Sequence, residues 1–185
     1  MDQLVFYSKS KNADPGAGIH EKTEDCYDEL KKYDNWRKQL SNFDCSVEFM
    51  FNNYRYRSVE HAFQGTKISL ADKSKGFLFT IDSGHIIGQS DGAIAQKNRK
   101  LLKLSPEQIT EWNKISCQVM KDATYAKYGH ALQNNNHIVK MLLATKNSKL
   151  IHLQLQRGKP SKLIHFKHLE DIRTTLNNQN ELSCV

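Results

Sequence analysis

The sequence predicts a mainly helical α+β fold, with a small hairpin or sheet, in a single compact domain that covers residues 1–185. Three observations lead to this expectation. Helical patterns outnumber strand patterns, the strand patterns are short and include one hairpin, and no repeat or interdomain linker interrupts the 185 residues. A chain of this length usually forms one domain, and a hydrophobic content of 38% is low but sufficient for one core.

Short apolar or alternating runs predict the strands. Residues 46–57 indicate a hairpin, because apolar and aromatic residues alternate on both sides of Asn52-Asn53, a pair that tolerates the positive φ of a tight turn. Further strands are expected at Leu4–Tyr7, Lys149–Leu155 and Leu163–Phe166. Residues 157–160, Arg-Gly-Lys-Pro, are typical of a turn.

Capping residues predict where the main helices begin. Ser105–Gln108 form a capping box with proline at the first helical position, and Gly129 is expected to close this helix. Ser58 stands at the N-cap of a helix that reaches about Leu70. Other helices are expected over residues 21–39, 93–102, 137–145 and 169–176. The glycine-rich stretch 73–92 is expected to be irregular, and the polar tail 177–185 to be frayed.

The composition favours an anionic partner and excludes several classes of protein. The net charge is +7 and the pI is near 9.2, which suits nucleic acid, a nucleotide or another phosphate-bearing ligand. No apolar run has the length of a membrane helix and the start lacks signal-peptide features, so we expect a cytoplasmic or nuclear protein without a membrane partner. The four cysteines form no CxxC pair, so we expect reduced thiols, no metal and no cofactor.

Glu60, Gln64 and Lys67 are spaced four and three residues apart, which places them along one side of the helix that follows Ser58. Glu60 and Lys67 then lie roughly 10 Å apart along the axis, a gap that admits a sugar-sized group between a carboxylate and an amine. The plainer alternative is a helix-dipole interaction for Glu60 and a solvated Lys67. A separate side of the helix carries the expected core stripe: Val59, Ala62, Phe63, Thr66 and Leu70.

The loop Asp14–Gly18 contains two glycines whose backbone N–H groups can approach a phosphate closely, although a plain turn is the alternative. Trp36, beside Arg37, either stacks on a base or covers the core. Trp112 lies on the apolar face of its helix, where a core position is the default. Arg55 and Arg57 precede Glu60 on the hairpin and predict a positively charged rim.

Several segments together resemble a known family. Residues 6–10 read FYSKS and precede Pro-Gly-x-Gly, residues 35–43 read NWRKQLSNF, and residues 56–67 read YRSVEHAFQGTK. In this order and spacing they resemble the longer, eukaryote-and-virus branch of the YbiA-like (NADAR) family, over about residues 5–176. Residues 157–161 depart from the bacterial branch, which has Asp-x-x-Trp-Gly-x-Gly there, so no aspartate is carried over.

The resemblance implies an N-glycosidase that removes ADP-ribose from guanine bases in nucleic acid or nucleotides, with ADP-ribose as product. It leaves open hydrolysis of a small ribosylated metabolite, such as a riboflavin-pathway intermediate, and a non-catalytic ADP-ribose-binding module. Glu60 matches the family's essential carboxylate and Lys67 its lysine, so both are expected to be catalytic. Substrate binding is expected from Tyr7, Ser8, Lys9, Gly16, Gly18, Trp36, Arg37, Asn42, Phe43, His61, Gln64 and Trp112.

Overall fold

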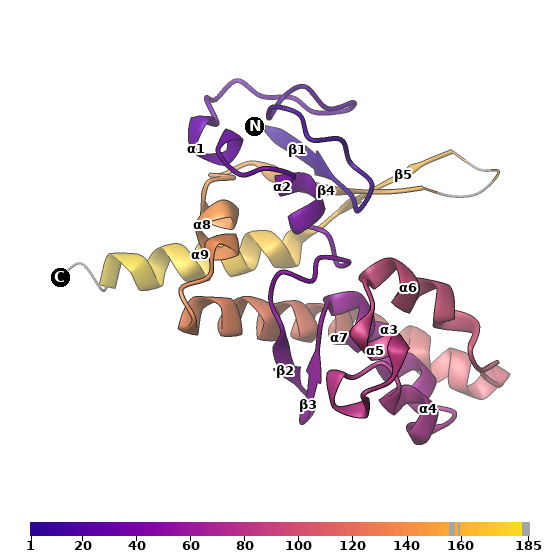
Figure 1. Cartoon of the computed structure of the whole chain (residues 1–185). Helices are drawn as coiled ribbons and strands as arrows, with labels where there is room; N and C mark the ends of the chain where they lie inside the picture. Colours follow the sequence, from indigo (N-terminus) through magenta and orange to yellow (C-terminus); the bar gives the residue numbers. More distant parts are fainter. Residues whose placement is uncertain (156–157, 159, 183–185) are drawn as a thin grey trace. The chain divides into compact units, whose positions relative to one another are not determined.

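The computed structural model describes residues 1–155, 158 and 160–182. Helices predominate over short strands, which confirms the predicted α+β class (Figure 1). The chain forms two compact units: the terminal unit comprises residues 1–41 and 135–185, and the central unit comprises residues 42–134. The expected single domain stays a prediction, and each unit is described by itself.

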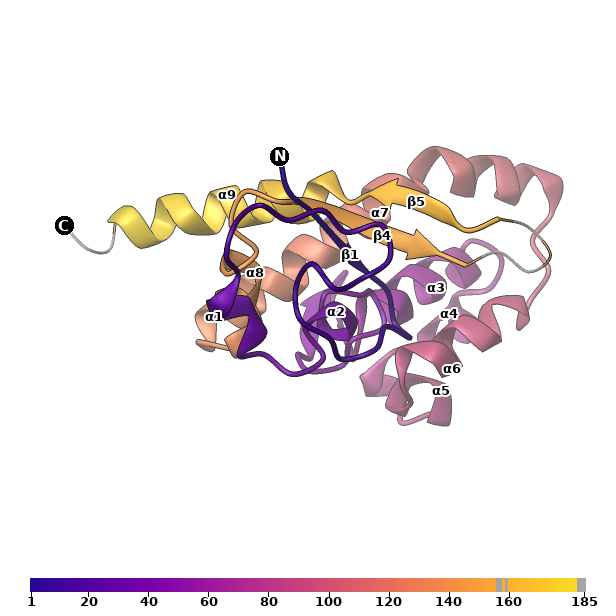
Figure 2. The same ribbon diagram turned by 90° about the horizontal axis from the view of Figure 1, so that it is seen from above.

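The terminal unit is built on a three-stranded sheet with the order β1-β4-β5. β1 (Gln3–Phe6) runs parallel to β4 (Lys149–Gln154), and β4 pairs with β5 (Lys162–His165) in the antiparallel sense (Figure 2). All three strands lie within one residue or so of their predicted positions. The core on this sheet includes Leu4, Phe6 and Leu150, each with no exposed surface.

The C-terminal part of the terminal unit contributes α8 (His137–Leu143) and α9 (Lys167–Leu182). α9 packs against both α8 and β4. It continues past its expected end at residue 176, so residues 177–182 are helical. The predicted turn at 157–160 falls largely outside the described residues, as do residues 183–185.

The helix predicted over residues 21–39 is wrong. Two short helices form instead, α1 (Asp28–Lys31) and α2 (Trp36–Gln39), separated by Asn35 in the left-handed conformation with φ of 56°. Asn35 is held there because its backbone N–H donates to Oδ1 of Asn12 at 2.7 Å. Asparagine tolerates this conformation better than most residues, and the contact that selects it comes from far along the sequence.

The central unit contains the predicted hairpin and the helix that follows it. β2 (Phe49–Phe51) pairs with β3 (Tyr54–Tyr56), and Asn52 and Asn53 make the turn with φ of 48° and 67°. α3 (Val59–Ser69) begins after Ser58, whose Oγ accepts from the backbone N–H of His61. The hairpin, the cap and the helix are therefore confirmed.

α7 (Pro106–Gln133) is the long helix of the central unit, and its predicted capping box is present. It passes through Gly129, so the predicted end is wrong. Glycine inside a helix costs about 1 kcal/mol relative to alanine, which a helix of this length tolerates. The end falls at Asn134, where Nδ2 bonds back to the carbonyl of His130 at 2.8 Å, and the chain then turns at Asn135 with φ of 48°.

Residues 73–92 are not irregular as expected but form short helical segments: α4 (Lys73–Phe77), η1 (Ile81–Ser83) and α5 (Ile86–Gln89). Each begins after a side chain that caps it, namely Asp72, Thr80 and His85. α6 (Gly92–Lys97) and η2 (Asn98–Lys100) follow, close to the expected helix over 93–102. None of the described helices has the length and apolar character needed to span a membrane.

Candidate functional site in the central unit

Glu60 lies in the first turn of α3 and is buried, with 5% of its surface exposed. Its backbone N–H donates to the carbonyl oxygen of Asn42 at 2.9 Å. Its Oε1 accepts a hydrogen bond from Nε2 of Gln64 at 2.8 Å. Among the described residues no partner is found for the other oxygen, Oε2. One oxygen is therefore held by a hydrogen bond, and the second is free to contact a ligand.

Burial raises the pKa of Glu60, because removing the carboxylate from water penalises its charged form. The hydrogen bond from Gln64 and the positive charges of Arg99 and Lys67 oppose this change. The carboxylate is thus less stable as an anion than an exposed glutamate. Such a group accepts a proton, or stabilises a developing positive charge, more readily than a well-solvated one.

Gln64 and Lys67 follow Glu60 on α3, as the spacing predicts. Gln64 is buried, and its Oε1 has no hydrogen-bond partner. Lys67 is half-buried and its ammonium group makes no hydrogen bond or ion pair with the described part of the chain. Its charge nevertheless acts on Glu60. The carboxylate, an unpaired amide oxygen and an unpaired amine therefore belong to one short helix.

The helix is more deeply buried than its apolar pattern suggests. Phe63, Thr66 and Leu70 of the expected core stripe are only half-buried, whereas Glu60 and Gln64, expected on another side, are buried. The reason is that α3 packs against α4, α6 and α7, so neighbours cover more than one of its sides. The spacing of apolar residues predicts which single face of a helix is covered. It cannot predict burial on several sides.

His61 has a structural position. It is fully buried, with Oγ of Ser58 at 2.7 Å from Nδ1 and the carbonyl oxygen of Ile87 at 3.0 Å from Nε2. Burial lowers the pKa of His61 to about 4, so the ring is neutral near pH 7. Both ring nitrogens are occupied, and the ring anchors the start of α3 rather than offering a donor to a ligand, contrary to the expected binding role.

Asn42 and Phe43 lie directly before the hairpin and are half-buried. The carbonyl of Asn42 holds the backbone of Glu60, and its Nδ2 donates to the sulfur of Met120 at 3.0 Å. Phe43 lies against Gly92, where an added Cβ would come within 2.4 Å of the Phe43 Cα. The glycine therefore lets the start of α6 approach this loop, and Asn42 helps to position Glu60.

Trp112 belongs to an apolar cluster. It is 7% exposed and its ring meets that of Phe63 edge-on at 4.7 Å between centroids. Buried members of the same cluster include Ile68, Phe79 and Leu104. Trp112 thus takes the core position that its helix face predicts, and the substrate-pocket role implied by the resemblance gains no support.

The positive rim expected from the hairpin stays a prediction, and the two predicted arginines differ in their contacts. Nε of Arg55 donates to Asp82 at 2.7 Å, so its charge is paired. Arg57 donates from Nη1 to the carbonyl of Gln89. The arginine whose charge reaches Glu60 is Arg99 on η2, which sequence reasoning did not single out. In the sequence, Arg99 stands out only as part of a local run of basic residues. Such a run does not indicate which carboxylate lies close to it in the fold.

The glycine loop and the remaining predicted residues

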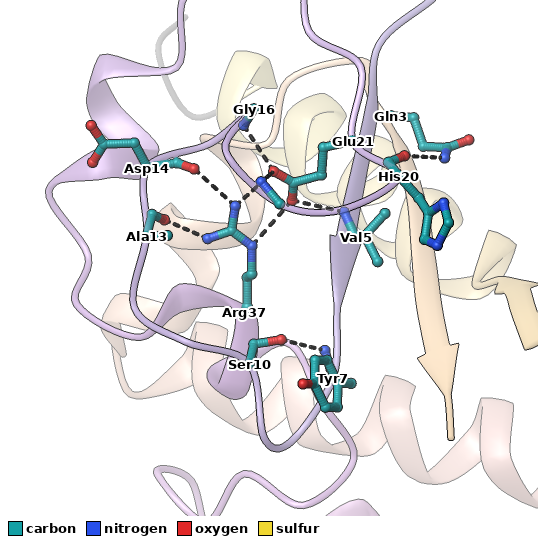
Figure 3. Close-up of polar contacts among 11 residues, drawn as sticks. Gln3, Val5, Tyr7, Ser10, Ala13, Asp14, Gly16, His20, Glu21 and Arg37 are labelled. Carbon is teal, nitrogen blue, oxygen red and sulfur yellow. Dashed lines mark hydrogen bonds and ion pairs between the residues drawn. The ribbon is translucent and has the colours of Figure 1, made fainter. Parts of the chain in front are cut away.

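The loop of residues 14–18, here called the glycine loop, encloses a carboxylate of its own chain (Figure 3). Oε2 of Glu21 accepts from the backbone N–H groups of Gly16 and Gly18, both at 2.9 Å. Oε1 accepts from the N–H of Val5 at 3.0 Å. Arg37 donates to both oxygens, at 3.1 and 2.7 Å. The glycines do approach an anion closely, but the N–H groups expected to bind a phosphate are already donated to Glu21.

Arg37 is not free to bind a substrate in this arrangement. Besides its two contacts with Glu21, it donates to the carbonyl oxygens of Ala13 and Asp14 (Figure 3). Its side chain is 5% exposed and that of Glu21 is fully buried. The guanidinium group lies over the ring of Trp36, 4.1 Å from the centroid, and Trp36 is itself buried. Trp36 therefore covers the core, and stacking on a base is not available to it.

The three remaining predicted residues, Tyr7, Ser8 and Lys9, lie in a turn that precedes the glycine loop. The backbone N–H of Tyr7 donates to Oγ of Ser10, and the N–H of Ser10 donates to the carbonyl of Tyr7 (Figure 3). Tyr7 and Ser8 are half-buried and Lys9 is exposed. These three side chains are accessible, and their role in binding stays a prediction.

The terminal unit also has two surface hollows. The larger, of about 630 Å³, is lined by residues that include Tyr27, Tyr33, Lys140 and Lys146. The smaller, of about 230 Å³, lies beside Asp14 and Lys31. Neither is lined by any residue predicted to be catalytic or substrate-binding.

Comparisons with known proteins add a structural likeness. No family model matches the chain, and no curated protein matches it. Among solved structures, the chain is similar to the NMR structure of the E. coli protein YbiA, with a TM-score of 0.48 and 16% identity, over 96% of this chain and 93% of that one. At such an identity and TM-score this likeness carries no activity over to this chain.

Proposed function

We propose that the chain is an N-glycosidase that removes ADP-ribose from guanine bases in nucleic acid or nucleotides. The observation that carries the proposal is the Glu60 carboxylate, which is buried, has one oxygen fixed by Gln64, and lies on the same helix as the unpaired amine of Lys67. The motifs at residues 35–43 and 56–67 supply the class of reaction. Glu60 supplies a group that is able to perform it.

Breaking the bond between ribose C1 and a guanine nitrogen leaves positive charge on the sugar while the bonding electrons go to the base. A carboxylate close to C1 stabilises that charge, and it also accepts a proton from the water that attacks C1. Burial strengthens this interaction, because charges attract more strongly where water is excluded. By donating to Oε1, Gln64 keeps the carboxylate of Glu60 oriented, with Oε2 as the reacting oxygen.

Lys67 offers a second route to the same products. In this route the neutral amine attacks C1, guanine leaves with one proton of the amine, and the ring oxygen takes the other as the ring opens. The resulting imine is hydrolysed by water, which regenerates the amine and releases ADP-ribose. Borohydride added during turnover would reduce the imine and leave a sugar adduct on Lys67, detectable by mass spectrometry. Turnover without any adduct, together with an active Lys67→Arg variant, selects direct attack by water.

The deciding experiment supplies the chain with labelled ADP-ribosyl-guanine, both in an oligonucleotide and as the free nucleoside, and measures the release of ADP-ribose. We expect ADP-ribose and an unmodified base as products. Cleavage of a ribosylated riboflavin-pathway intermediate alone would retain the reaction class and reject the substrate. Binding of ADP-ribose without cleavage of any of these compounds would make the chain a binding module and contradict the proposal.

A further inference from the structure

Residues 97–103, here called the basic segment, lie beside the helix that carries Glu60. The segment contains four basic side chains and no acidic one: Lys97, Arg99, Lys100 and Lys103. All four are exposed. η2, at the centre of the segment, packs against both α6 and α3. A concentration of positive charge therefore adjoins the buried carboxylate within the same unit.

Arg99 differs from Arg55 of the same unit because most of the N–H donors of its guanidinium group make no hydrogen bond with the residues that the structure describes. Nη1 donates to the carbonyl of Gln96, just before the segment, at 3.1 Å. No acidic partner for Arg99 is found in the described part of the chain, whereas Arg55 is paired with Asp82. Its charge acts on Glu60, as does that of Lys67. Two cations with unused donors thus lie on η2 and α3, two elements that pack together.

We propose that Arg99 binds a phosphate group of the substrate at the Glu60 site, and that the ligand is a diphosphate such as that of ADP-ribose. This inference rests on the proposed function. In ADP-ribose only the ribose ring and its C5 separate the reacting C1 from the diphosphate, so a site that holds C1 at Glu60 brings two negatively charged groups close together. A cation beside the carboxylate removes that repulsion.

The chemistry of the side chain fits this role. A guanidinium group presents parallel N–H donors that match two phosphate oxygens, and such charge-assisted bonds are stronger than neutral ones. Exposure of Arg99 allows a ligand to reach it. The glycine loop offers no comparable set of donors, because Gly16 and Gly18 already donate to Glu21.

The test measures dissociation constants for ADP-ribose and for inorganic pyrophosphate, with the parent chain, Arg99→Gln and Arg99→Lys. Lys114→Gln is the matched control, since it removes one positive charge from an exposed position on α7. We expect Arg99→Gln to weaken the binding of both ligands by about tenfold or more, as loss of a charged hydrogen bond does. Arg99→Lys should restore part of the affinity, and Lys114→Gln should bind like the parent. Unchanged thermal unfolding of each variant shows that the fold is intact.

Parent-like binding of both ligands by Arg99→Gln would overturn the inference, as would an equal loss in Lys114→Gln, which indicates only net charge. The proposed function is tested separately, by measuring cleavage of the substrate. A parent chain that releases ADP-ribose with the same KM as Arg99→Gln keeps the function and loses the inference. A parent chain that cleaves nothing but binds pyrophosphate through Arg99 loses the function and keeps the anion site.

Discussion

Glu21 in the terminal unit and Glu60 in the central unit are both buried, yet their hydrogen bonding is opposite. The carboxylate of Glu21 accepts five hydrogen bonds, from three backbone N–H groups and twice from Arg37. The carboxylate of Glu60 accepts one, from Gln64. Burial alone therefore does not distinguish a structural carboxylate from a reactive one. What differs between the two is the number of donors that face each carboxylate.

The physical basis of the difference is the cost of taking a charge out of water. Five donors replace most of the hydration that Glu21 loses, and Arg37 balances its charge. Glu60 receives no such replacement, and burial raises its pKa. We infer that Glu21 fixes the glycine loop, while the chain holds Glu60 in a less stable state that a substrate can relieve.

The largest effect is expected at Glu21. Glu21→Gln replaces one acceptor oxygen by an NH₂ group that faces donors, and it leaves Arg37 buried without a counter-charge. Breaking a buried ion pair in this way typically costs about 3–5 kcal/mol. Urea unfolding measures the change, with the exposed Glu29→Gln as control, which should leave the stability unchanged. A Glu21→Gln chain as stable as the parent would show that the five contacts do not hold the loop.

Glu60 should show the reverse behaviour. Glu60→Gln keeps an oxygen that accepts from Gln64, so the chain should fold normally and still bind ADP-ribose. The rate of ADP-ribose release should fall at least about a hundredfold, which is typical of removing a positioned acid or base. The exposed Glu48→Gln serves as control and should remain active. Near-parental turnover by folded Glu60→Gln would exclude this residue from the mechanism.

The two regions also differ in how far the sequence could predict them. The hairpin turn at Asn52-Asn53, the cap at Ser58 and the capping box at Ser105 were predictable, because each depends on residues close together in the chain. The motifs located Glu60, Gln64 and Lys67 on one helix for the same reason.

Contacts between distant residues could not be predicted. Asn12 holds Asn35 just before α2, and Glu21 occupies the glycine loop. Arg99 lies near α3 because η2 packs against that helix. The motif resemblance implied substrate binding by Arg37 and Gly16. It could not reveal that their partner is an internal carboxylate rather than a ligand.

A pH dependence should separate Glu60 from an ordinary glutamate. Because burial raises the pKa of Glu60 above its usual 4.5, the folded state binds the proton more tightly than the unfolded state does. The stability that the parent owes to this proton is present at pH values below 4.5 and is lost as the pH rises through the raised pKa. Relative to Glu60→Gln, the parent should therefore become less stable across that window, as urea unfolding at several pH values would measure.

The activity should change in the opposite direction over the same range. If Glu60 reacts as a carboxylate, turnover rises as the group loses its proton, and the acidic limb of the rate profile lies above the range of an exposed glutamate. Arg99→Gln removes a charge that lowers the pKa of Glu60, so this limb should move to still higher pH. A limb that stays in place in Arg99→Gln would mean that the two charges do not interact.

The smallest expected effect concerns salt, and it tests whether a nucleic-acid strand contacts the central unit. Lys97, Lys100 and Lys103 are exposed in the basic segment, and phosphates of a strand bound at Glu60 would lie within its field. Each phosphate neutralised on a single strand contributes a slope of roughly −0.7 to the dependence of log K on log salt concentration. Changing the three lysines together to glutamine should therefore make the slope for an ADP-ribosyl-guanine oligonucleotide less steep by about 2. The free nucleoside should be cleaved as before.

Arg55→Gln is the control, because its charge is already paired with Asp82 and its loss should change the slope little. If the triple variant and the parent respond identically to salt on both substrates, the strand makes no contact here, and a free nucleotide becomes the better substrate.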